Sequence, residues 1–145
     1  MTAVLLDVNL LIALAWPNHI HHRLATHWFR QDSSRPFATC PITEAGFVRL
    51  SMNSRVVGEA ASFQQATHFL AEYCKSPDHV FWSPDVDVAS ATNGLDVSGH
   101  RQVTDAYLLA VAQLKGGRLA TLDSGIREII PPGSLLSKHL LIVET

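Results

Sequence analysis

The most constraining feature of the sequence is a short apolar run near the amino end that stops abruptly at a carboxylate. Residues 3–6 read Ala-Val-Leu-Leu, and Asp7 follows them directly. The run is too short for an independent helix and too apolar for a strand with one face in solvent. It therefore fits a strand buried on both faces, as in a parallel sheet. Asp7 then lies at the carboxyl tip of that strand, where open α/β sheets place their sites.

Short apolar runs alternate with amphipathic segments along the rest of the chain. We expect strands at residues 3–7, 36–40, 80–82, 118–122 and 140–143. Helical spacing of apolar residues predicts helices at 8–15, 20–30, 43–52, 62–73, 85–91, 103–114 and 124–130. This alternation is typical of an α/β fold with a central, mostly parallel five-stranded sheet flanked by helices. We expect a single domain over residues 1–145, the strand order 3-2-1-4-5, and a helical hairpin at about 42–75.

Local patterns mark several helix ends. Asn9 is the expected N-cap of the first helix, and Thr43 is the expected cap of the helix that carries Glu44. The segment Ser62-Phe63-Gln64-Gln65 has the form of a capping box, in which the first and last side chains each bond the other's backbone N–H. Gly116-Gly117 is expected to stop the helix that begins at residue 103.

The composition excludes several classes of protein. A hydrophobic content of 47% excludes a disordered chain, and no apolar run is long enough to span a bilayer. The amino end lacks the basic and apolar regions of a signal peptide, so we expect a cytoplasmic location. Cys40 and Cys74 are too few for a disulfide scaffold or a zinc cluster, and we expect two buried, reduced thiols.

The formal net charge of −2, from 11 basic and 13 acidic residues, argues weakly against nucleic-acid binding. This average conceals the local distribution, however. If four of the acids share one pocket, the rest of the chain is slightly basic. A metal ion in that pocket would change the local field further.

Four acids are expected at the same edge of the predicted sheet. Asp7 and Asp123 each follow a strand, Glu44 begins the helix after the second strand, and Asp105 lies in the first turn of the helix before the fourth. Helix N-termini favour acids by about 0.3–1 kcal/mol without any function. That preference does not explain convergence on one crevice, because two carboxylates about 5 Å apart repel by about 3 kcal/mol at an effective dielectric of 20. Oxygen ligands without His or Cys favour Mg²⁺ or Mn²⁺ as the ion that relieves this repulsion.

Four ordered segments resemble the motifs of PIN-domain ribonucleases, and most closely those of the VapC-like toxins of bacterial toxin–antitoxin pairs. The segments are Leu5-Leu6-Asp7-Val8-Asn9, Thr43-Glu44-Ala45-Gly46-Phe47-Val48-Arg49-Leu50, Val103-Thr104-Asp105-Ala106-Tyr107-Leu108-Leu109-Ala110 and Ala120-Thr121-Leu122-Asp123. The resemblance covers nearly the whole chain in order and at the expected spacings, although residues 54–99 carry no motif.

The resemblance implies a Mg²⁺- or Mn²⁺-dependent endoribonuclease that inhibits translation or growth. The metal-binding catalytic residues would be Asp7, Glu44, Asp105 and Asp123. The polar residues that support them would be Asn9, Thr104 and Thr121. Candidate RNA contacts, suggested by the bidentate grip of arginine on phosphate and by position near the site, are Arg49, Arg55 and Arg101. The resemblance further implies a cognate antitoxin bound in a hydrophobic groove near the site, and a homodimer.

Other classes of α/β protein with an acidic pocket fit these residues less well. A phosphatase with an aspartyl nucleophile would need a second acid two residues after Asp7, where Asn9 stands. A receiver-type phosphoacceptor would need a lysine after a late strand, and none is suitably placed. A catalytically silent PIN scaffold that only binds a partner is the remaining alternative, and the intact acid set argues against it. The four histidines at 19, 21, 22 and 27 have no acid or cysteine nearby and are expected to form a polar helix face rather than a metal site.

Overall fold

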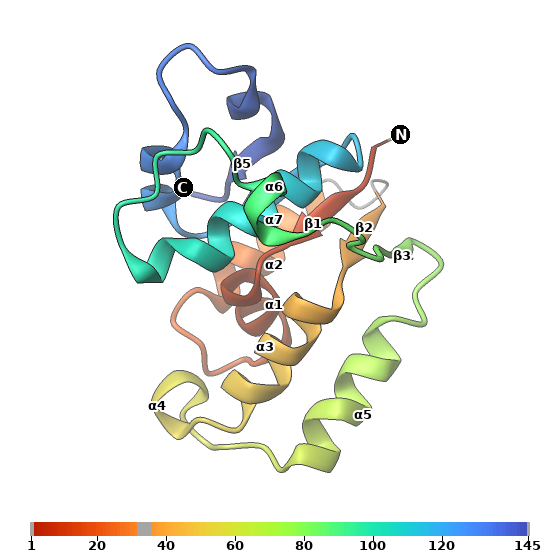
Figure 1. Cartoon of the computed structure of the whole chain (residues 1–145). Coiled ribbons are helices and arrows are strands. Elements are labelled where there is room, and N and C mark those ends of the chain that lie inside the picture. The colour runs from red at the N-terminus through yellow and green to blue at the C-terminus, as the bar shows by residue number, and fades with distance from the viewer. Residues whose placement is uncertain (1, 32–35, 145) are drawn as a thin grey trace.

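The sheet is all-parallel, and its order is the one expected from the sequence. The computed structural model describes residues 2–31 and 36–144. Its strands run in the order β3-β2-β1-β4-β5 (Figure 1). Their bounds are β1 Val4–Leu6, β2 Phe37–Thr39, β3 His79–Phe81, β4 Arg118–Thr121 and β5 Leu140–Ile142. β1 pairs with both β2 and β4, so the carboxyl ends of these three strands meet at one edge.

Helices connect successive strands and cover both faces of the sheet. The α-helices are α1 Val8–Ala15, α2 His22–Gln31, α3 Pro41–Ser51, α4 Ser54–Val57, α5 Phe63–Tyr73, α6 Val88–Ala91 and α7 Val103–Leu114. The 3-10 helices are η1 His100–Gln102, η2 Ser124–Ile129 and η3 Leu135–His139. Of these, η1 and η3 were not expected, nor was the short helix α4 between the predicted helices at 43–52 and 62–73. The stop at Gly116 is confirmed, since this residue has a φ of +70° and Gly117 N donates to Ala112 O at 2.9 Å.

The alternation of side chains along β1 divides the core into two layers. Leu5 packs with residues of α7 and η2, whereas Val4 and Leu6 pack with residues of α1, α2 and α3. All three β1 side chains are at most 1% exposed. This is the two-sided burial that the apolar run predicted, and it fixes Asp7 at the point where the chain leaves the sheet.

Two of the predicted helix caps are wrong. The N-cap of α1 is Asp7, whose backbone is extended and whose carboxylate accepts a hydrogen bond from Val8 N, so Asn9 lies inside the helix. The N-cap of α3 is Cys40, because Pro41 takes the first helical position and needs no N–H partner. Thr43 lies three residues further on, and its hydroxyl accepts from Cys40 N and donates to Cys40 O, both at 3.0 Å.

The segment between β2 and β3 is helical, as expected. In Figure 1, α3 and α5 lie side by side, with α4 and a loop between them. The predicted capping box at the start of α5 is confirmed: Gln65 N donates to Ser62 Oγ at 3.1 Å, and Ser62 N donates to Gln65 Oε1 at 2.8 Å. These reciprocal bonds fix where α5 begins, and its other end leads into β3.

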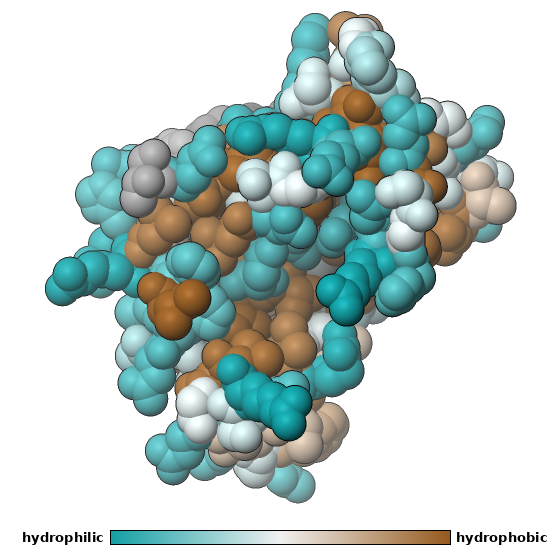
Figure 2. Space-filling view, turned by 90° about the vertical axis from the view of Figure 1, so that its left-hand side faces the viewer, coloured by the Kyte–Doolittle hydropathy of each residue, from teal (hydrophilic) through white to brown (hydrophobic). Residues whose placement is uncertain are grey.

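The surface mixes polar and apolar side chains. Figure 2 shows one face on which apolar side chains gather in patches separated by hydrophilic ones. Among the large apolar residues that lie exposed on the molecule are Ile20, Leu135 and Leu114. Within residues 2–31 and 36–144, no helix is both long and apolar enough to cross a membrane.

Candidate active site

Asp7 is buried at the tip of β1 and is held by two hydrogen bonds. Only 5% of the residue is exposed. Val8 N donates to Asp7 Oδ1 and Thr121 Oγ1 donates to Asp7 Oδ2, each at 2.8 Å. Burial raises the pKa of Asp7 above its ordinary value, the two hydrogen bonds oppose that rise, and the charge of Asp123 adds to it. Asp7 is therefore a fixed carboxylate in a place that disfavours uncompensated negative charge.

The Thr121 hydroxyl connects β4 to the start of α1. It is fully buried, donates to Asp7, and accepts from Asn9 Nδ2 and from Asp123 N, both at 3.1 Å. Asn9 also accepts from Leu122 N at 3.2 Å through its side-chain oxygen. This network sets the direction of Asp7 and the backbone position of Asp123. The structure thus gives Asn9 and Thr121 the contacts expected of supporting residues.

Asp105 and Asp123 complete an aspartate cluster with Asp7. Asp105 lies half-buried in the first turn of α7. Burial, and then the charges of Asp7 and Asp123, raise the pKa of Asp105 to about 7. Asp123 is exposed and caps η2, with Gly125 N donating to its Oδ1 at 2.9 Å. The charge of Asp123 raises the pKa values of both Asp7 and Asp105, and such a gathering of negative charge favours a bound cation.

Glu44 lies at the same sheet edge, but its carboxylate has other partners. Thr39 Oγ1 donates to Glu44 Oε2 at 2.7 Å and lies 2.7 Å from His79 Nε2. Cys74 Sγ lies 3.9 Å from the same hydroxyl. Glu44 contributes to the shifts in the pKa values of Cys74 and His79, whereas Asp7 and Asp105 respond to the other aspartates. Four acids were expected to converge. The structure brings together three aspartates, whereas the Glu44 carboxylate lies beside them and is hydrogen-bonded to Thr39.

Cys74 and His79 are the residues near this edge that the sequence reasoning missed. Cys74 is half-buried rather than buried, which corrects one of the two thiol predictions. Burial raises the pKa of the Cys74 thiol and lowers the pKa of His79, although the charge of Glu44 opposes the second shift. The signal available in the sequence was the spacing, because a Cys and a His five residues apart on a tight connection fall in the range of metal-ligand pairs.

The other predicted residues lie exposed around the aspartate cluster or on neighbouring helices. Thr104 is in the first turn of α7, next to Asp105, and Arg101 is in η1 just before that helix. Arg49 is in the last turn of α3, and Arg55 is in α4. Arginines at these positions are free to approach a phosphate from solvent.

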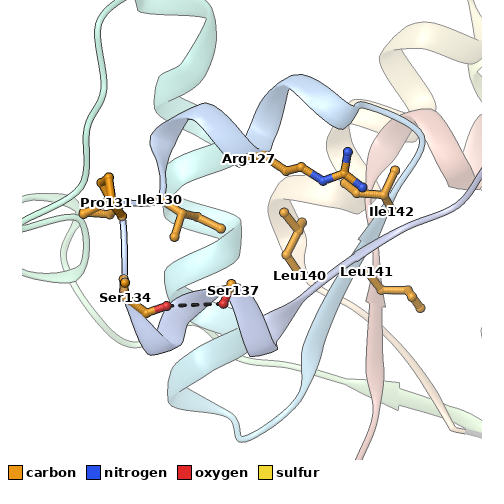
Figure 3. Close-up of a pocket in the computed structure, with 10 residues that line it drawn as sticks. Arg127, Ile130, Pro131, Ser134, Ser137, Leu140, Leu141 and Ile142 are labelled. Carbon is orange, nitrogen blue, oxygen red and sulfur yellow. Dashed lines mark hydrogen bonds between the residues drawn. The ribbon is translucent and has the colours of Figure 1, made fainter.

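Among the hollows that lie outside the aspartate cluster, two bear on the choice of site. One, of about 590 Å³, runs between α3 and α5 and is mainly apolar; its lining residues are Pro41, Glu44, Ala45, Val48, Arg49, Met52, Phe63, Thr67 and Leu70. The other, of about 630 Å³, lies along β5 (Figure 3), with Leu140, Leu141 and Ile142 on one side and Ile130, Pro131 and Ser134 on the other. Its charged residue, Arg127, pairs with Glu144 at 3.4 Å, so this hollow does not share the acids of the candidate site.

Comparison with known proteins identifies the family to which the chain belongs. The PIN domain family profile matches residues 4–130, so the chain belongs to the PIN-domain family. Within it, the chain resembles the VapC ribonucleases. It is 48% identical over 135 residues to "Ribonuclease VapC39" of Mycobacterium tuberculosis, with 92% of this chain and 96% of the relative covered. It is 45% identical over 122 residues to "Ribonuclease VapC38" of the same species, covering 84% of this chain and 86% of that one.

A solved structure supports the fold independently. The crystal structure of Mycobacterium tuberculosis VapC20, titled a "Sarcin-Ricin loop cleaving toxin", superposes with a TM-score of 0.62. The match covers 89% of this chain and all of that one, at 16% sequence identity. At that identity the similarity concerns the fold alone, and the sequence relatives carry the family assignment.

Proposed function

We propose that the chain is the toxin of a toxin–antitoxin pair and acts as an endoribonuclease that needs Mg²⁺ or Mn²⁺. The observation that carries this proposal is the aspartate cluster, in which the pKa of Asp105 is raised to about 7 by burial and by Asp7 and Asp123. The names of the ribonuclease relatives, at up to 48% identity, support the reaction class. RNA is the substrate class, and the consequence in the cell is inhibited translation or growth.

The residues of the cluster fit a hard divalent ion. Asp7, Asp105 and Asp123 offer carboxylate oxygens, the ligands that Mg²⁺ and Mn²⁺ prefer. Burial, and then the charges of neighbouring aspartates, raise the pKa values of Asp7 and Asp105, and a cation between the carboxylates would offset both effects. Glu44 would join them, directly or through water, once its side chain leaves Thr39. When bound, such an ion supplies Lewis-acid chemistry, which acidifies an attacking water and offsets charge on the phosphate.

The chain's own residues position these groups and the substrate. Thr121 and Asn9 hold Asp7 by the hydrogen bonds described above, so the carboxylate is preorganised before RNA arrives. Thr104 is a polar neighbour at the start of α7. We assign the phosphate contacts to the exposed side chains of Arg49, Arg55 and Arg101, because guanidinium groups bind phosphate oxygens in pairs. The acid set is complete, which disfavours a silent scaffold.

We also propose a cognate antitoxin, a homodimer and a cytoplasmic location. The apolar hollow between α3 and α5 is suited to an amphipathic segment of the antitoxin, since Val48, Met52 and Leu70 line it beside Glu44 and Arg49. An antitoxin arginine near the acids would complement their charge. Co-purification with the product of the neighbouring reading frame tests the first proposal, and light scattering of the purified chain tests the second.

Cleavage of single-stranded and structured RNAs tests the enzymatic proposal. Cleavage should need Mg²⁺ or Mn²⁺, stop with a chelator, and fall by about 10²–10³-fold in Asp7→Asn and in Asp105→Asn, because several kcal/mol of charge stabilisation would be lost. Glu59→Gln is the control, since it removes an exposed carboxylate from the loop before α5. Metal-dependent cleavage that persists in both aspartate variants would refute the site assignment.

A further inference from the structure

The Glu44 side chain takes part in a second cluster whose chemistry differs from that of the aspartates. One ligand atom each from Glu44, Cys74 and His79 lies within 4.8 Å of the other two. These residues come from three places in the fold: the first turn of α3, the C-cap of α5 and the first residue of β3. All three are half-buried, so the cluster is formed by the fold and still reached by solvent.

The three donor atoms are a carboxylate oxygen, a thiol sulfur and an imidazole nitrogen. Hard ions such as Mg²⁺ do not select sulfur, whereas zinc-like ions bind all three donor types. Tetrahedral zinc with bonds of about 2.0–2.3 Å places its donors about 3.5 Å apart. The present separations of up to 4.8 Å therefore require a contraction that side-chain rotation can supply. Thr39 Oγ1 now contacts all three side chains, at 2.7, 2.7 and 3.9 Å, and keeps them facing one point.

We propose that Glu44, Cys74 and His79 form a binding site for one divalent ion of the zinc class, separate from the hard-ion site at Asp7, Asp105 and Asp123. Three protein ligands leave a fourth position for water. On binding, the Cys74 thiol releases its proton to solvent and the sulfur coordinates as a thiolate. The His79 ring coordinates in its neutral form, through the Nε2 atom that faces Thr39.

Occupation of this site has a consequence for catalysis, and this part rests on the proposed ribonuclease function. Glu44 would be shared between the two metal sites. A zinc-class ion fixes the Glu44 carboxylate on the side of Cys74 and His79, away from the aspartates. Such an ion therefore inhibits the Mg²⁺-dependent cleavage of RNA, and the inhibition requires Cys74.

Cobalt substitution tests the site without any need for activity. Co²⁺ added to the reduced protein should give a thiolate-to-cobalt charge-transfer band in the near ultraviolet, together with visible bands of a four-coordinate ion, at one equivalent. The charge-transfer band should disappear in Cys74→Ser, and binding of Co²⁺ should weaken by about 10–100-fold in His79→Gln. Asp7→Asn should retain both bands, because Asp7 belongs to the other site. A wild-type protein without the band, or a band that survives Cys74→Ser, overturns the proposal.

The histidines near the start of α2 are the main competing ligands. The His19 and His21 rings have centroids 5.7 Å apart, with His19 half-buried and His21 exposed, so the double variant His19→Gln/His21→Gln is the matched control. It should keep the charge-transfer band, since no cysteine is part of that patch. If it abolishes the band instead, the proposed ligand set is wrong.

Alkylation of the wild-type thiols gives a measurement that requires no variant to fold. Cys74 is half-buried and Cys40 is buried, so Cys40 serves as the internal reference. Zn²⁺ should slow modification of Cys74 by iodoacetamide by about tenfold or more, whereas Mg²⁺ should not, because only a sulfur-binding ion masks the thiolate. Equal rates with and without Zn²⁺ overturn the metal site. A protein that gains protection but has no ribonuclease activity retains the site and loses only the inhibitory consequence.

Discussion

Two buried threonines, at the ends of the strands on either side of β1, each hold an acid but have different further partners. Thr121 ends β4 and donates to Asp7 at 2.8 Å; Thr39 ends β2 and donates to Glu44 at 2.7 Å. Both threonines are fully buried. The other partners of Thr121 are amide groups, whereas those of Thr39 are the His79 ring and the Cys74 thiol.

The difference separates a permanently fixed acid from one that can change partners. Amides do not titrate, so the amide partners of Thr121 donate the same hydrogen bonds at any physiological pH. The network around Glu44 includes an imidazole and a thiol, which exchange protons and bind soft metals. The carboxyl edge of the sheet therefore holds two groups of ligands. The group beside Thr121 is rigid and consists of hard oxygen ligands, whereas the group beside Thr39 is adjustable and mixes oxygen, nitrogen and sulfur.

The first prediction compares the two threonines directly. Thr121→Val removes the donor to Asp7 and leaves Asn9 Nδ2 and Asp123 N without their acceptor, so Mg²⁺-dependent cleavage should fall by about 10–100-fold. Thr39→Val should lower cleavage by less than about tenfold, because a half-buried Glu44 carboxylate is solvated when released. Single-turnover rates on one RNA at saturating metal measure both. Equal losses would remove the proposed distinction between a fixed and an adjustable acid.

The second prediction concerns the pH dependence of stability without metal. The pKa of Asp105 is raised from 3.8 to about 7, so its contribution to stability is fully present below about pH 4 and is lost as pH rises through 7. Between pH 4 and 8 in a chelator, wild type should lose about 2 kcal/mol of unfolding free energy relative to Asp105→Asn, after solvent screening is allowed for. Urea unfolding of both proteins gives the difference.

Added metal should reverse that difference. At pH 8, Mg²⁺ binds the native aspartate cluster and raises the unfolding free energy of wild type by RT ln(1 + c/Kd), where c is the free Mg²⁺ concentration. Asp105→Asn lacks one ligand and should gain much less. If the two proteins keep the same stability difference from pH 4 to 8, burial and the neighbouring aspartates do not raise the pKa of Asp105.

Much of this arrangement could be read from the sequence, and the reason is local. Strands buried on both faces are continuous apolar runs, so the strands of the sheet were predictable. Acids that follow such strands, or that begin a helix of an α/β fold, fall at the carboxyl edge of the sheet, so the positions of Asp7, Asp123 and Asp105 at that edge were predictable as well. The direction of Glu44 was not, because it depends on a hydroxyl five residues earlier and on a ring that arrives from β3.

The helix caps failed for a related reason. An N-cap needs extended backbone as well as a suitable side chain, and Asp7 has both because it ends the turn out of β1. A reading that assigns Asp7 to the strand moves the cap onward to Asn9. Sequence reasoning therefore placed the candidate residues at one sheet edge and missed which of their side chains bond to the backbone.

The third prediction tests whether packing between α1 and α3 couples the two groups. A Cβ at Gly46 would lie 2.6 Å from Val8 Cγ2, and the β-branched valine has little freedom to move. Gly46→Ala should lower the unfolding free energy by about 1–3 kcal/mol, partly offset by the better helix propensity of alanine. It should also weaken cleavage, since α1 follows Asp7 and α3 carries Glu44.

A double-mutant cycle identifies the cause of that loss. Val8→Ala removes both methyl groups that the new Cβ would meet. The loss of unfolding free energy in the double variant should therefore be about 1 kcal/mol smaller than the sum of the losses in the two single variants. Additive losses would show that contact with Val8 is not the reason, and the proposed coupling between the helices would fail.

The smallest expected effect distinguishes the two groups of ligands by the elements that hold each group in place. Ser62 begins α5, and the other end of that helix carries Cys74. Ser62→Ala breaks the capping box and should reduce the unfolding free energy by about 1 kcal/mol, whereas Ser62→Asn should keep most of the cap. Cobalt binding at Cys74 should weaken slightly in the alanine variant, because a frayed α5 holds the thiol less firmly. Cleavage of RNA with Mg²⁺ should stay unchanged, because Asp7, Asp105 and Asp123 are positioned by β1, α7 and β4. A loss of both cobalt binding and cleavage in Ser62→Ala would mean that the same elements position both groups of ligands.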